Sequence, residues 1–555
     1  MRQGNRPAHR TSRVRRGFGL VISGAIALTT LLAVPSTTLA AGGLTMTGFK
    51  PASGPIGTVV TVTGTGFASG DIVAFNGTPA MSSTANKKGT KLKASVPAFA
   101  TSGPITVTDA ATGQTVGLPG TAFDVTAGLF ASPNHVWAGG SLTVAGSALA
   151  PDQTAPLDVG KVLVGEAQTN ANGDFSVGVV IPWNIPSGKT KLSVIASVGR
   201  FTFPIFIVGS WPSFHHDLSQ SGVQPYEPTL TPKTVGGLGE LWGDLADSVV
   251  YSSPAVANGT LYVGSDDQNV YALNVTNGTL DWRYTTGNAV QSSPAVANGV
   301  VYIGSEDGNV YALNASTGAV DWTYATGDSI QSSPQVSGGL LYIGSEDDNV
   351  YALNATTGAL VWKYTTGDIV DSSPAVANGI VYIGSADGHL YALTATTGVL
   401  DWSASISGLG RSSPAVVGGR VYISSGDTNI YAVNATTGAI VWHYDTGQPN
   451  VSTPAVANGL VFVGSGEGDV YALDAATGAT QWAFYAGGEV ISSPAVADGV
   501  VYVGSYDDDL YALAASNGNE LWSGKPGSTI GSSPAVANGM VFVGSSDGSI
   551  SAYGL

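Results

Sequence analysis

The chain of 555 residues contains no cysteine and, for its length, few charged side chains. The absence of cysteine excludes disulfides, covalently attached haem and a lipoprotein-type lipid anchor. Basic residues are scarcest in the second part of the chain, where residues 241–555 hold 28 acidic and five basic side chains. Such a field repels phosphate backbones and anionic lipid headgroups. Nucleic acid is therefore not an expected partner.

The longest apolar run lies near the N-terminus and has the arrangement of an export signal. Six arginines accompany an apolar stretch from Gly19 to Val34, and small residues at 38–40 offer a cleavage site. The pair Arg15-Arg16 resembles a twin-arginine signal, and ordinary Sec export is the alternative. No later apolar stretch is long enough to span a bilayer. We predict an export signal over residues 1–40 and a secreted or extracellular mature protein without a membrane span.

From about residue 240 onward, one 40-residue unit is repeated eight times. Each unit carries a Ser-Ser-Pro marker, replaced once by Ser-Thr-Pro, and one tryptophan at a fixed place. A repeat of this length with several short strands is typical of a β-propeller, in which one repeat forms one blade. The markers begin at Ser252, Ser292, Ser332, Ser372, Ser412, Ser452, Ser492 and Ser532. The tryptophans are Trp242, Trp282, Trp322, Trp362, Trp402, Trp442, Trp482 and Trp522.

Turn residues divide each unit into four strands. In the unit that begins at Ser292, we expect strands at 294–297, 300–303, 310–313 and 319–324. The dipeptide Asn298-Gly299 tolerates the positive φ angles of a tight hairpin between the first two. These strands and their turns use all 40 positions, so no room remains for a helix or a catalytic insertion.

The two ends of the repeat array complement each other. The last unit, from Ser532 to Leu555, ends without its tryptophan strand, whereas Trp242 lies ahead of the first complete unit. We predict that this N-terminal strand completes the last blade. The result is an eight-bladed ring without exposed strand edges.

The segment between the signal and the repeats predicts two all-β modules. Residues 44–125 contain Gly48-Phe49-Lys50-Pro51, the run from Val60 to Gly64, and Phe75-Asn76-Gly77-Thr78. This pattern resembles an IPT/TIG domain, which implies an immunoglobulin-like β-sandwich. Residues 126–208 alternate apolar and polar positions between Gly, Pro and Asn turns, which favours a second immunoglobulin-like domain. Such modules are most often spacers or adhesion units, and a ligand site in either is the alternative.

The repeats also carry a family resemblance. The pattern Tyr-Ala-Leu-Asn-x-x-Thr-Gly-x-x-x-Trp, as in Tyr351 to Trp362, resembles the tryptophan-docking repeat of the PQQ-like propeller superfamily, named after the quinoprotein dehydrogenases. The segment from Trp211 to Gly222 resembles the leader that commonly precedes such propellers. The resemblance covers residues 209–555 and implies that the tryptophans stack across neighbouring blades. Likeness of fold does not transfer activity.

Acidic residues cluster in the turns between the second and third strands of the units. Carboxylates and carbonyls there could ligate calcium, but Asp, Asn and Gly are also what tight turns require. We interpret these acids as turn formers and predict no metal site. The pair His215-His216 lacks a further ligand pattern and is interpreted as structural. The acids are Asp266, Asp267, Glu306, Asp307, Glu346, Asp347, Asp348, Asp427, Glu467, Asp507, Asp508, Asp509 and Asp547.

The quinoprotein resemblance implies a planar quinone held between a tryptophan and a disulfide of adjacent cysteines, with a calcium ion and a catalytic aspartate. This chain has no cysteine, and all eight repeat tryptophans occupy the docking position. His389 and His443 stand at different repeat positions, and no Ser-His-acid pattern accompanies them. We therefore expect no cofactor and no catalytic residues.

Positions that differ between blades are free to serve a ligand. The residue before each serine marker is such a position, and it should surround one mouth of the central channel. Gln291, Gln331, Asp371 and Arg411 are polar and come from consecutive blades, so we predict that they bind a ligand. Arg411 can anchor a carboxylate or pair with Asp371. Random drift at a tolerant loop position is the alternative. The eight residues are Tyr251, Gln291, Gln331, Asp371, Arg411, Val451, Ile491 and Gly531.

The sequence as a whole predicts a secreted or cell-surface, non-enzymatic binding protein. Two immunoglobulin-like domains precede an eight-bladed propeller that interacts with a protein or carbohydrate ligand at the cell envelope. We expect a monomer. A quinoprotein-type oxidoreductase and a purely structural surface protein are the alternatives.

Overall fold

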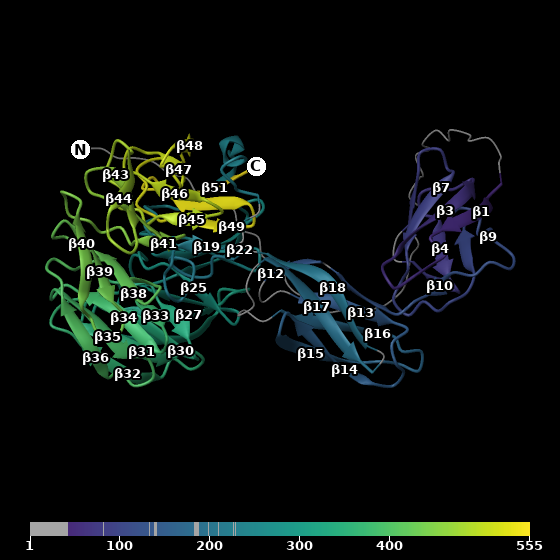
Figure 1. Cartoon of the computed structure of the whole chain (residues 1–555), viewed down its shortest axis with the longest axis horizontal. Coiled ribbons are helices and arrows are strands. Elements are labelled where there is room, and N and C mark those ends of the chain that lie inside the picture. The colour runs from purple at the N-terminus through teal and green to yellow at the C-terminus, as the bar shows by residue number, and fades with distance from the viewer. Residues whose placement is uncertain are drawn as a thin grey trace, which may run out of the picture.

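A computed structural model describes residues 43–80, 83–132, 134–137, 141–181, 188–197, 199–208, 210–225, 227 and 229–555. Regular structure in these residues is β-strand, apart from one 3-10 turn, η1 (Val235–Gly237). The strands form two sandwiches followed by the propeller (Figure 1). Over this same part of the chain, no helix is long and apolar enough to cross a membrane. The predicted export signal over residues 1–40 lies outside the described residues.

The first sandwich has two four-stranded sheets and a short two-stranded pair. Its strands alternate between core and solvent: in KLKAS, Leu92 and Ala94 are buried while both lysines are exposed. The larger sheets have the orders β1-β3-β7-β6 and β5-β4-β8-β9. The strands are β1 (Thr45–Lys50), β2 (Ser53–Gly54), β3 (Val59–Thr65), β4 (Ile72–Phe75), β5 (Thr78–Pro79), β6 (Ser83–Ala85), β7 (Lys91–Ser95), β8 (Ile105–Thr108), β9 (Thr115–Gly117) and β10 (Asp124–Val125).

The second sandwich packs a three-stranded sheet on a five-stranded one around a shared apolar core that includes Val144, Leu157 and Val194. The sheet orders are β11-β13-β16 and β12-β18-β17-β14-β15. The strands are β11 (Gly128–Ser132), β12 (His135–Trp137), β13 (Ser141–Ser147), β14 (Thr154–Val159), β15 (Val162–Gln168), β16 (Phe175–Val180), β17 (Gly188–Ala196) and β18 (Gly199–Val208).

The repeats form eight antiparallel sheets, each with four repeat strands. The innermost strands are β21 (Ala255–Ala257), β25 (Ala295–Ala297), β29 (Gln335–Ser337), β33 (Ala375–Ala377), β37 (Ala415–Val417), β41 (Ala455–Ala457), β45 (Ala495–Ala497) and β49 (Ala535–Ala537). The second strands are β22 (Thr260–Gly264), β26 (Val300–Gly304), β30 (Leu340–Gly344), β34 (Ile380–Ser385), β38 (Arg420–Ser424), β42 (Leu460–Gly464), β46 (Val500–Gly504) and β50 (Met540–Gly544).

The third strands are β23 (Asn269–Asn274), β27 (Asn309–Asn314), β31 (Asn349–Asn354), β35 (His389–Thr394), β39 (Asn429–Asn434), β43 (Asp469–Asp474), β47 (Leu510–Ala514) and β51 (Ser549–Gly554). The outermost strands, which carry the tryptophans, are β20 (Gly239–Leu245), β24 (Leu280–Thr285), β28 (Val320–Ala325), β32 (Leu360–Thr365), β36 (Leu400–Ser405), β40 (Ile440–Asp445), β44 (Thr480–Tyr485) and β48 (Glu520–Gly524).

The ring closes as the sequence predicts. Strand β20, from the start of the repeat region, pairs antiparallel with β51 at the C-terminal end and places Trp242 opposite Ala552. The last sheet therefore has the order β20-β51-β50-β49 and combines both ends of the array in one blade. The predicted all-β class and the propeller are confirmed.

The serine markers form a closed circle of hydrogen bonds around the channel. In each blade, the backbone N–H of the second marker residue donates to the side-chain hydroxyl of its counterpart in the next blade, as from Ser253 to Ser293 at 2.9 Å. The last bond, from Ser533 back to Ser253 at 2.9 Å, completes the circle. The full order is Ser253, Ser293, Ser333, Ser373, Ser413, Thr453, Ser493 and Ser533.

The tryptophans join neighbouring blades, as the sequence predicts. Each indole N–H donates to a backbone carbonyl outside its own blade; Trp362, for example, donates to Ala395 at 2.9 Å. The phenol of Tyr342 donates to the same carbonyl at 3.1 Å. The ring of Trp362 also packs on Gly398, where a Cβ would lie 2.6 Å from ring atoms. Around the ring, the acceptors for the successive tryptophans are Val275, Ala315, Ala355, Ala395, Ala435, Ala475, Ala515 and Leu238.

Thr453 tests the hydroxyl circle because it is the single threonine among seven serines. Thr453→Val removes the hydroxyl while retaining the branched shape, and leaves the buried Ser413 N–H without its acceptor. We expect a loss of about 1–3 kcal/mol in unfolding free energy. Thr453→Ser keeps the hydroxyl and should lose less than about 1 kcal/mol. Urea denaturation of the mature chain measures both, and equal losses would contradict a role for the bond.

Trp362→Ala tests the docking contact. We expect a loss of about 3–5 kcal/mol, as for other buried aromatic truncations. Trp362→Phe keeps much of the packing and loses only one of two donors to Ala395, so its loss should be smaller. The shift of the propeller transition in urea measures the difference. A loss of under about 1 kcal/mol for Trp362→Ala, the usual range at surface positions, would show that the ring does not hold the blades together.

Candidate functional site

The leader, residues 211–224, runs along the inner strands of the propeller. Trp211 exchanges two backbone hydrogen bonds with Val256, at 2.8 and 2.7 Å, and Pro212 accepts from Val296 at 2.7 Å. Further along, the leader carbonyls of Leu218, Ser219, Ser221 and Gly222 accept from the N–H groups of Val376, Val416, Val456 and Val496. The amide of Gln335 reaches Phe214, and that of Gln224 reaches Val536. The leader therefore contacts the inner strand of every blade.

A polar network gives the leader its tight path. The carboxylate of Asp217 accepts hydrogen bonds from the backbone and hydroxyl groups of both Ser219 and Ser221. Positive φ angles at His215, His216 and Gln220 produce the bends. His215 is buried, and its Nδ1 lies 2.9 Å from the Gln220 carbonyl oxygen. Burial lowers the pKa of His215 to about 4. The predicted structural reading of His215-His216 fits these contacts.

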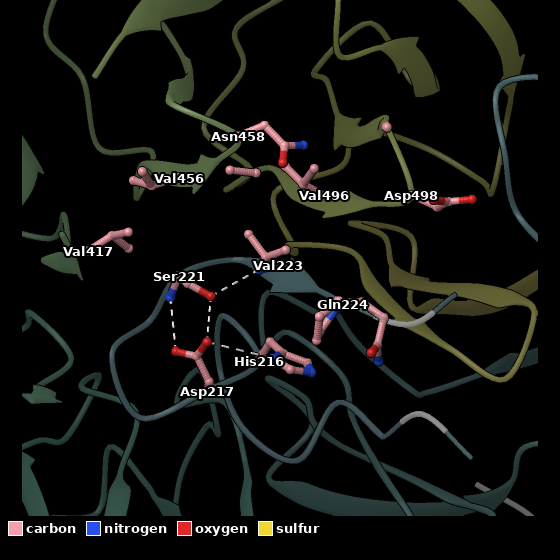
Figure 2. Close-up of a pocket in the computed structure, with 13 residues that line it drawn as sticks. His216, Asp217, Ser221, Val223, Gln224, Val417, Val456, Asn458, Val496 and Asp498 are labelled. Atoms are coloured by element: carbon pink, nitrogen blue, oxygen red, sulfur yellow. Dashed lines mark hydrogen bonds and ion pairs between the residues drawn. The ribbon is translucent and has the colours of Figure 1, made fainter. Parts of the chain in front are cut away.

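A cavity of about 520 Å³ lies between the leader and the turn ends of three blades (Figure 2). Val417, Val456 and Val496 supply an apolar side, and Asn458 and Asp498 lie near the turns. The Asp217 carboxylate at its border is already bonded to the leader serines. After the leader, the chain stays at this end of the channel, because Glu227 accepts the N–H of Gly539 in another such turn.

The opposite end of the channel holds the predicted ligand residues. Each precedes the innermost strand of its blade, whereas the cavity lies where these strands end. We call this end the arginine mouth. It comprises Tyr251, Gln291, Gln331, Asp371, Arg411, Val451, Ile491 and Gly531, together with the turn residues Asp266, Glu306, Glu346 and Tyr506.

Arg411 occupies a central place in the arginine mouth. Its Nε lies 3.7 Å from Asp371 Oδ2 in the preceding blade, so the pair expected from the sequence is present. The Arg411 charge also acts on Glu306, Glu346 and Tyr506, which belong to the second, third and seventh blades. The Arg411 charge therefore influences residues from blades on both sides of its own. The Arg411 side chain is 64% exposed, whereas that of Asp371 is 8% exposed.

Many of the predicted turn formers fall into two groups. The aspartate at the second turn position bonds within the turn: Asp267 accepts from the N–H of Asn269 at 2.9 Å and from the phenol of Tyr271 at 2.5 Å. Asp307, Asp347, Asp427 and Asp507 repeat this arrangement. The acid at the first turn position faces the arginine mouth instead, where Asp266 Oδ2 accepts a long bond of 3.4 Å from the Gln291 amide. Among the described residues, no three acids or histidines are placed to hold a metal.

The carboxylates of the arginine mouth are partly buried. Burial raises the pKa of Asp266, and the nearby Asp267 charge adds to the effect. Burial likewise raises the pKa of Glu306, Glu346 and Asp371, against the opposing effect of Arg411. One oxygen of Asp266 and one of Asp371 are buried without a hydrogen-bond partner.

The remaining arc of the arginine mouth is largely apolar. Tyr251 and Val451 are 37% and 38% exposed. Gly531 leaves space between blades, since a Cβ there would lie 3.0 Å from the Tyr251 ring and 3.4 Å from Ile491. The arginine mouth thus has carboxylates, amides and one guanidinium on one side and apolar side chains on the other.

The four predicted ligand residues therefore share one mouth, and two of them, Asp371 and Arg411, form an ion pair. The sequence did not single out Asp266, Glu306, Glu346 or Tyr506 as ligand residues. The sequence did contain a signal for these residues. The first residue of the turn differs between blades, as in Asp266, Ala386 and Ser546, whereas the residue after it is usually aspartate. The path of the leader left no comparable signal.

His215 should make stability depend on pH. The folded protein resists protonation of His215 down to about pH 4, whereas the unfolded chain accepts the proton near pH 6.5. Its contribution to stability is therefore full above pH 6.5 and falls as the pH drops toward 4, by about 3 kcal/mol in all. Unfolding free energies between pH 4 and 7 should show a shallower dependence in His215→Gln. The exposed His443→Gln is the control, and an equal slope in all three proteins would contradict the assignment.

The comparisons with known proteins agree with this geometry. The sequence model described as outer membrane protein assembly factor BamB matches residues 237–333, 327–453, 405–493 and 466–554. The IPT/TIG domain model matches residues 44–123. No curated protein sequence matches the chain.

Solved structures share the propeller fold at low identity. BamB from Moraxella catarrhalis is 22% identical with a TM-score of 0.51, and the match covers 57% of this chain and all of that one. A europium-containing methanol dehydrogenase is 15% identical with a TM-score of 0.57, over 62% of this chain and 98% of that one. The computationally designed protein Ika8 is 18% identical with a TM-score of 0.52, over 57% and 99%. At these identities the likeness concerns the fold.

The matched repeats extend from residue 237 to 554, which is more than half of the chain. This protein therefore belongs to the PQQ-like repeat family described as outer membrane protein assembly factor BamB, and it carries an IPT/TIG domain in addition.

Proposed function

We propose that this protein is a secreted or cell-surface, non-enzymatic binding protein that holds a ligand at the arginine mouth. The observation that carries the proposal is the gathering of blade-specific residues there. Serines and tryptophans that the ring needs recur in every blade, but Gln291, Asp371 and Arg411 do not. Polar side chains that the fold does not require, one of them buried with an unbonded oxygen, favour a binding role.

The course of the leader supports the choice of mouth. It fills the inner edge of the ring, and the chain then remains at the turn end of the channel. The arginine mouth lies at the other end, where a partner can approach the channel without displacing the leader. The two sandwiches then act as spacers on the leader side.

The positions of the tryptophans support a non-enzymatic role. A planar quinone of the kind that the dehydrogenase relatives imply needs an aromatic face on which to stack. The eight repeat tryptophans are committed to carbonyls between blades, and Trp211 is buried in the leader. The described residues of the arginine mouth therefore do not fit a quinone stacked on tryptophan.

The family supports a protein as the partner. Its description names an outer membrane protein assembly factor, and IPT/TIG domains accompany envelope or extracellular proteins. We propose an envelope or extracellular location and a protein ligand, with a carbohydrate as the second candidate.

Blocking the arginine mouth tests the proposal without altering charge. Gln291→Trp combined with Gln331→Trp places two large rings among half-buried mouth residues. The parent protein should capture members of a combined peptide and glycan array, and the double variant should lose at least about tenfold in signal. A tenfold loss corresponds to the binding free energy of one modest contact.

The matched control is Gln481→Trp, which makes the same change on the exposed outer strand β44 and should bind normally. Melting temperatures within a few degrees of the parent verify folding. Full capture by the folded double variant would place the site elsewhere, such as a sandwich. A parent protein that captures nothing would favour a purely structural surface protein.

A further inference from the structure

We propose that the arginine mouth selects a basic peptide segment, with a lysine or arginine beside an apolar residue, and rejects acidic ligands. This inference rests on the proposed function, since it names the ligand class of the same site. It differs from the expectation that Arg411 anchors a ligand carboxylate.

The balance of charge favours a cation. Four carboxylates, those of Asp266, Glu306, Glu346 and Asp371, share the arginine mouth with one guanidinium. The other basic residues of the propeller serve elsewhere: Arg420 bonds to the Ala475 carbonyl, and Lys525 pairs with Asp509 at 3.1 Å. Arg283 and Lys363 are exposed on the outermost strands β24 and β32. The Arg411 charge is therefore more than balanced before any ligand arrives, and an added carboxylate would meet net repulsion.

The unbonded oxygens also favour a nearby positive charge. The Asp371 side chain is 8% exposed, and its Oδ1 has no partner while its Oδ2 faces Arg411. Asp266 Oδ1 is likewise buried without a partner. A buried carboxylate that lacks hydrogen bonds is stabilised by an ammonium or guanidinium group placed nearby and destabilised by a second carboxylate. This observation is independent of the number of acids in the mouth.

The apolar arc sets the second requirement. Tyr251, Val451 and Ile491 lie in the blades that complete the ring around the polar residues. A ligand that spans the mouth from the carboxylates to this arc carries a cationic group next to an apolar side chain. Alternating basic and apolar residues in a peptide meet this description, and a simple inorganic cation does not.

A matched pair of peptides tests the inference. The probes are acetyl-Ala-Lys-Leu-Lys-Leu-Ala-amide and the same peptide with glutamate in place of both lysines, each with a fluorophore on an added C-terminal cysteine. Fluorescence anisotropy at about 50 mM salt gives both affinities, and about 500 mM salt shows how far charge controls them. We expect the lysine peptide to bind at least about tenfold more tightly and to weaken as salt increases.

Removing a positive or a negative charge from the arginine mouth should change the affinity for the lysine peptide in opposite directions. Arg411→Ala removes the competing cation and should tighten binding of the lysine peptide about threefold or more. Asp371→Asn should weaken it about tenfold. Glu346→Gln, at a half-buried turn position, should weaken it to a smaller degree and serves if Asp371→Asn fails to fold. The charge-matched controls Arg283→Ala and Asp321→Asn lie on exposed outer-strand positions and should leave the affinity unchanged.

The outcomes separate this inference from the function on which it rests. Tighter binding of the glutamate peptide, or loss of lysine-peptide binding in Arg411→Ala, overturns the cation assignment and leaves the binding role intact. The same conclusion follows if neither peptide binds while array ligands are still lost on blocking Gln291 and Gln331. If the blocked protein captures array ligands as well as the parent, both proposals fail together.

Discussion

The structure depends on a circle of hydrogen bonds that has no first or last member. Each second marker residue gives its N–H to the next blade and takes one from the blade before, and Ser533 returns to Ser253. A blade that shifted would lose bonds on both sides, so the circle fixes all eight inner strands at once. Further out, each tryptophan indole also links neighbouring blades by a hydrogen bond. The pairing of β20 with β51 closes the ring in the outer strands. The residues before the serine markers differ between blades because they take no part in this circle of hydrogen bonds.

This division between required and free positions explains where chemistry can appear. Thr453 replaces a serine in the circle because the bond needs only a hydroxyl. Two places earlier in the chain, no such bond constrains the side chain, and the ring carries residues as different as Asp371, Arg411 and Gly531. Carboxylates, a guanidinium and apolar groups can thus share one mouth without disturbing the blades that support it.

Most of the propeller could be predicted from the sequence because the pattern of each strand and turn is repeated eight times. Expected strands such as 300–303 and 310–313 correspond to β26 and β27 within one residue at each end, and the shared blade followed from Trp242. The segment from Trp211 to Gly222 was recognised as a leader, but its path along the inner strands escaped prediction because it binds mainly through backbone groups, which any sequence provides. Glu306 and Glu346 were hidden for another reason: an acid that faces the mouth and an acid that caps a turn stand side by side in the chain.

The leader also determines how the propeller is attached to the domains before it. The connection from the second sandwich does not end on the outer rim or on a single edge strand, because it enters at Trp211 and continues along the inner strands of all eight blades. Tension applied from the sandwiches would therefore act first on the bonds between Trp211 and Val256, and the contact with each blade would have to break in turn before the leader could leave the ring.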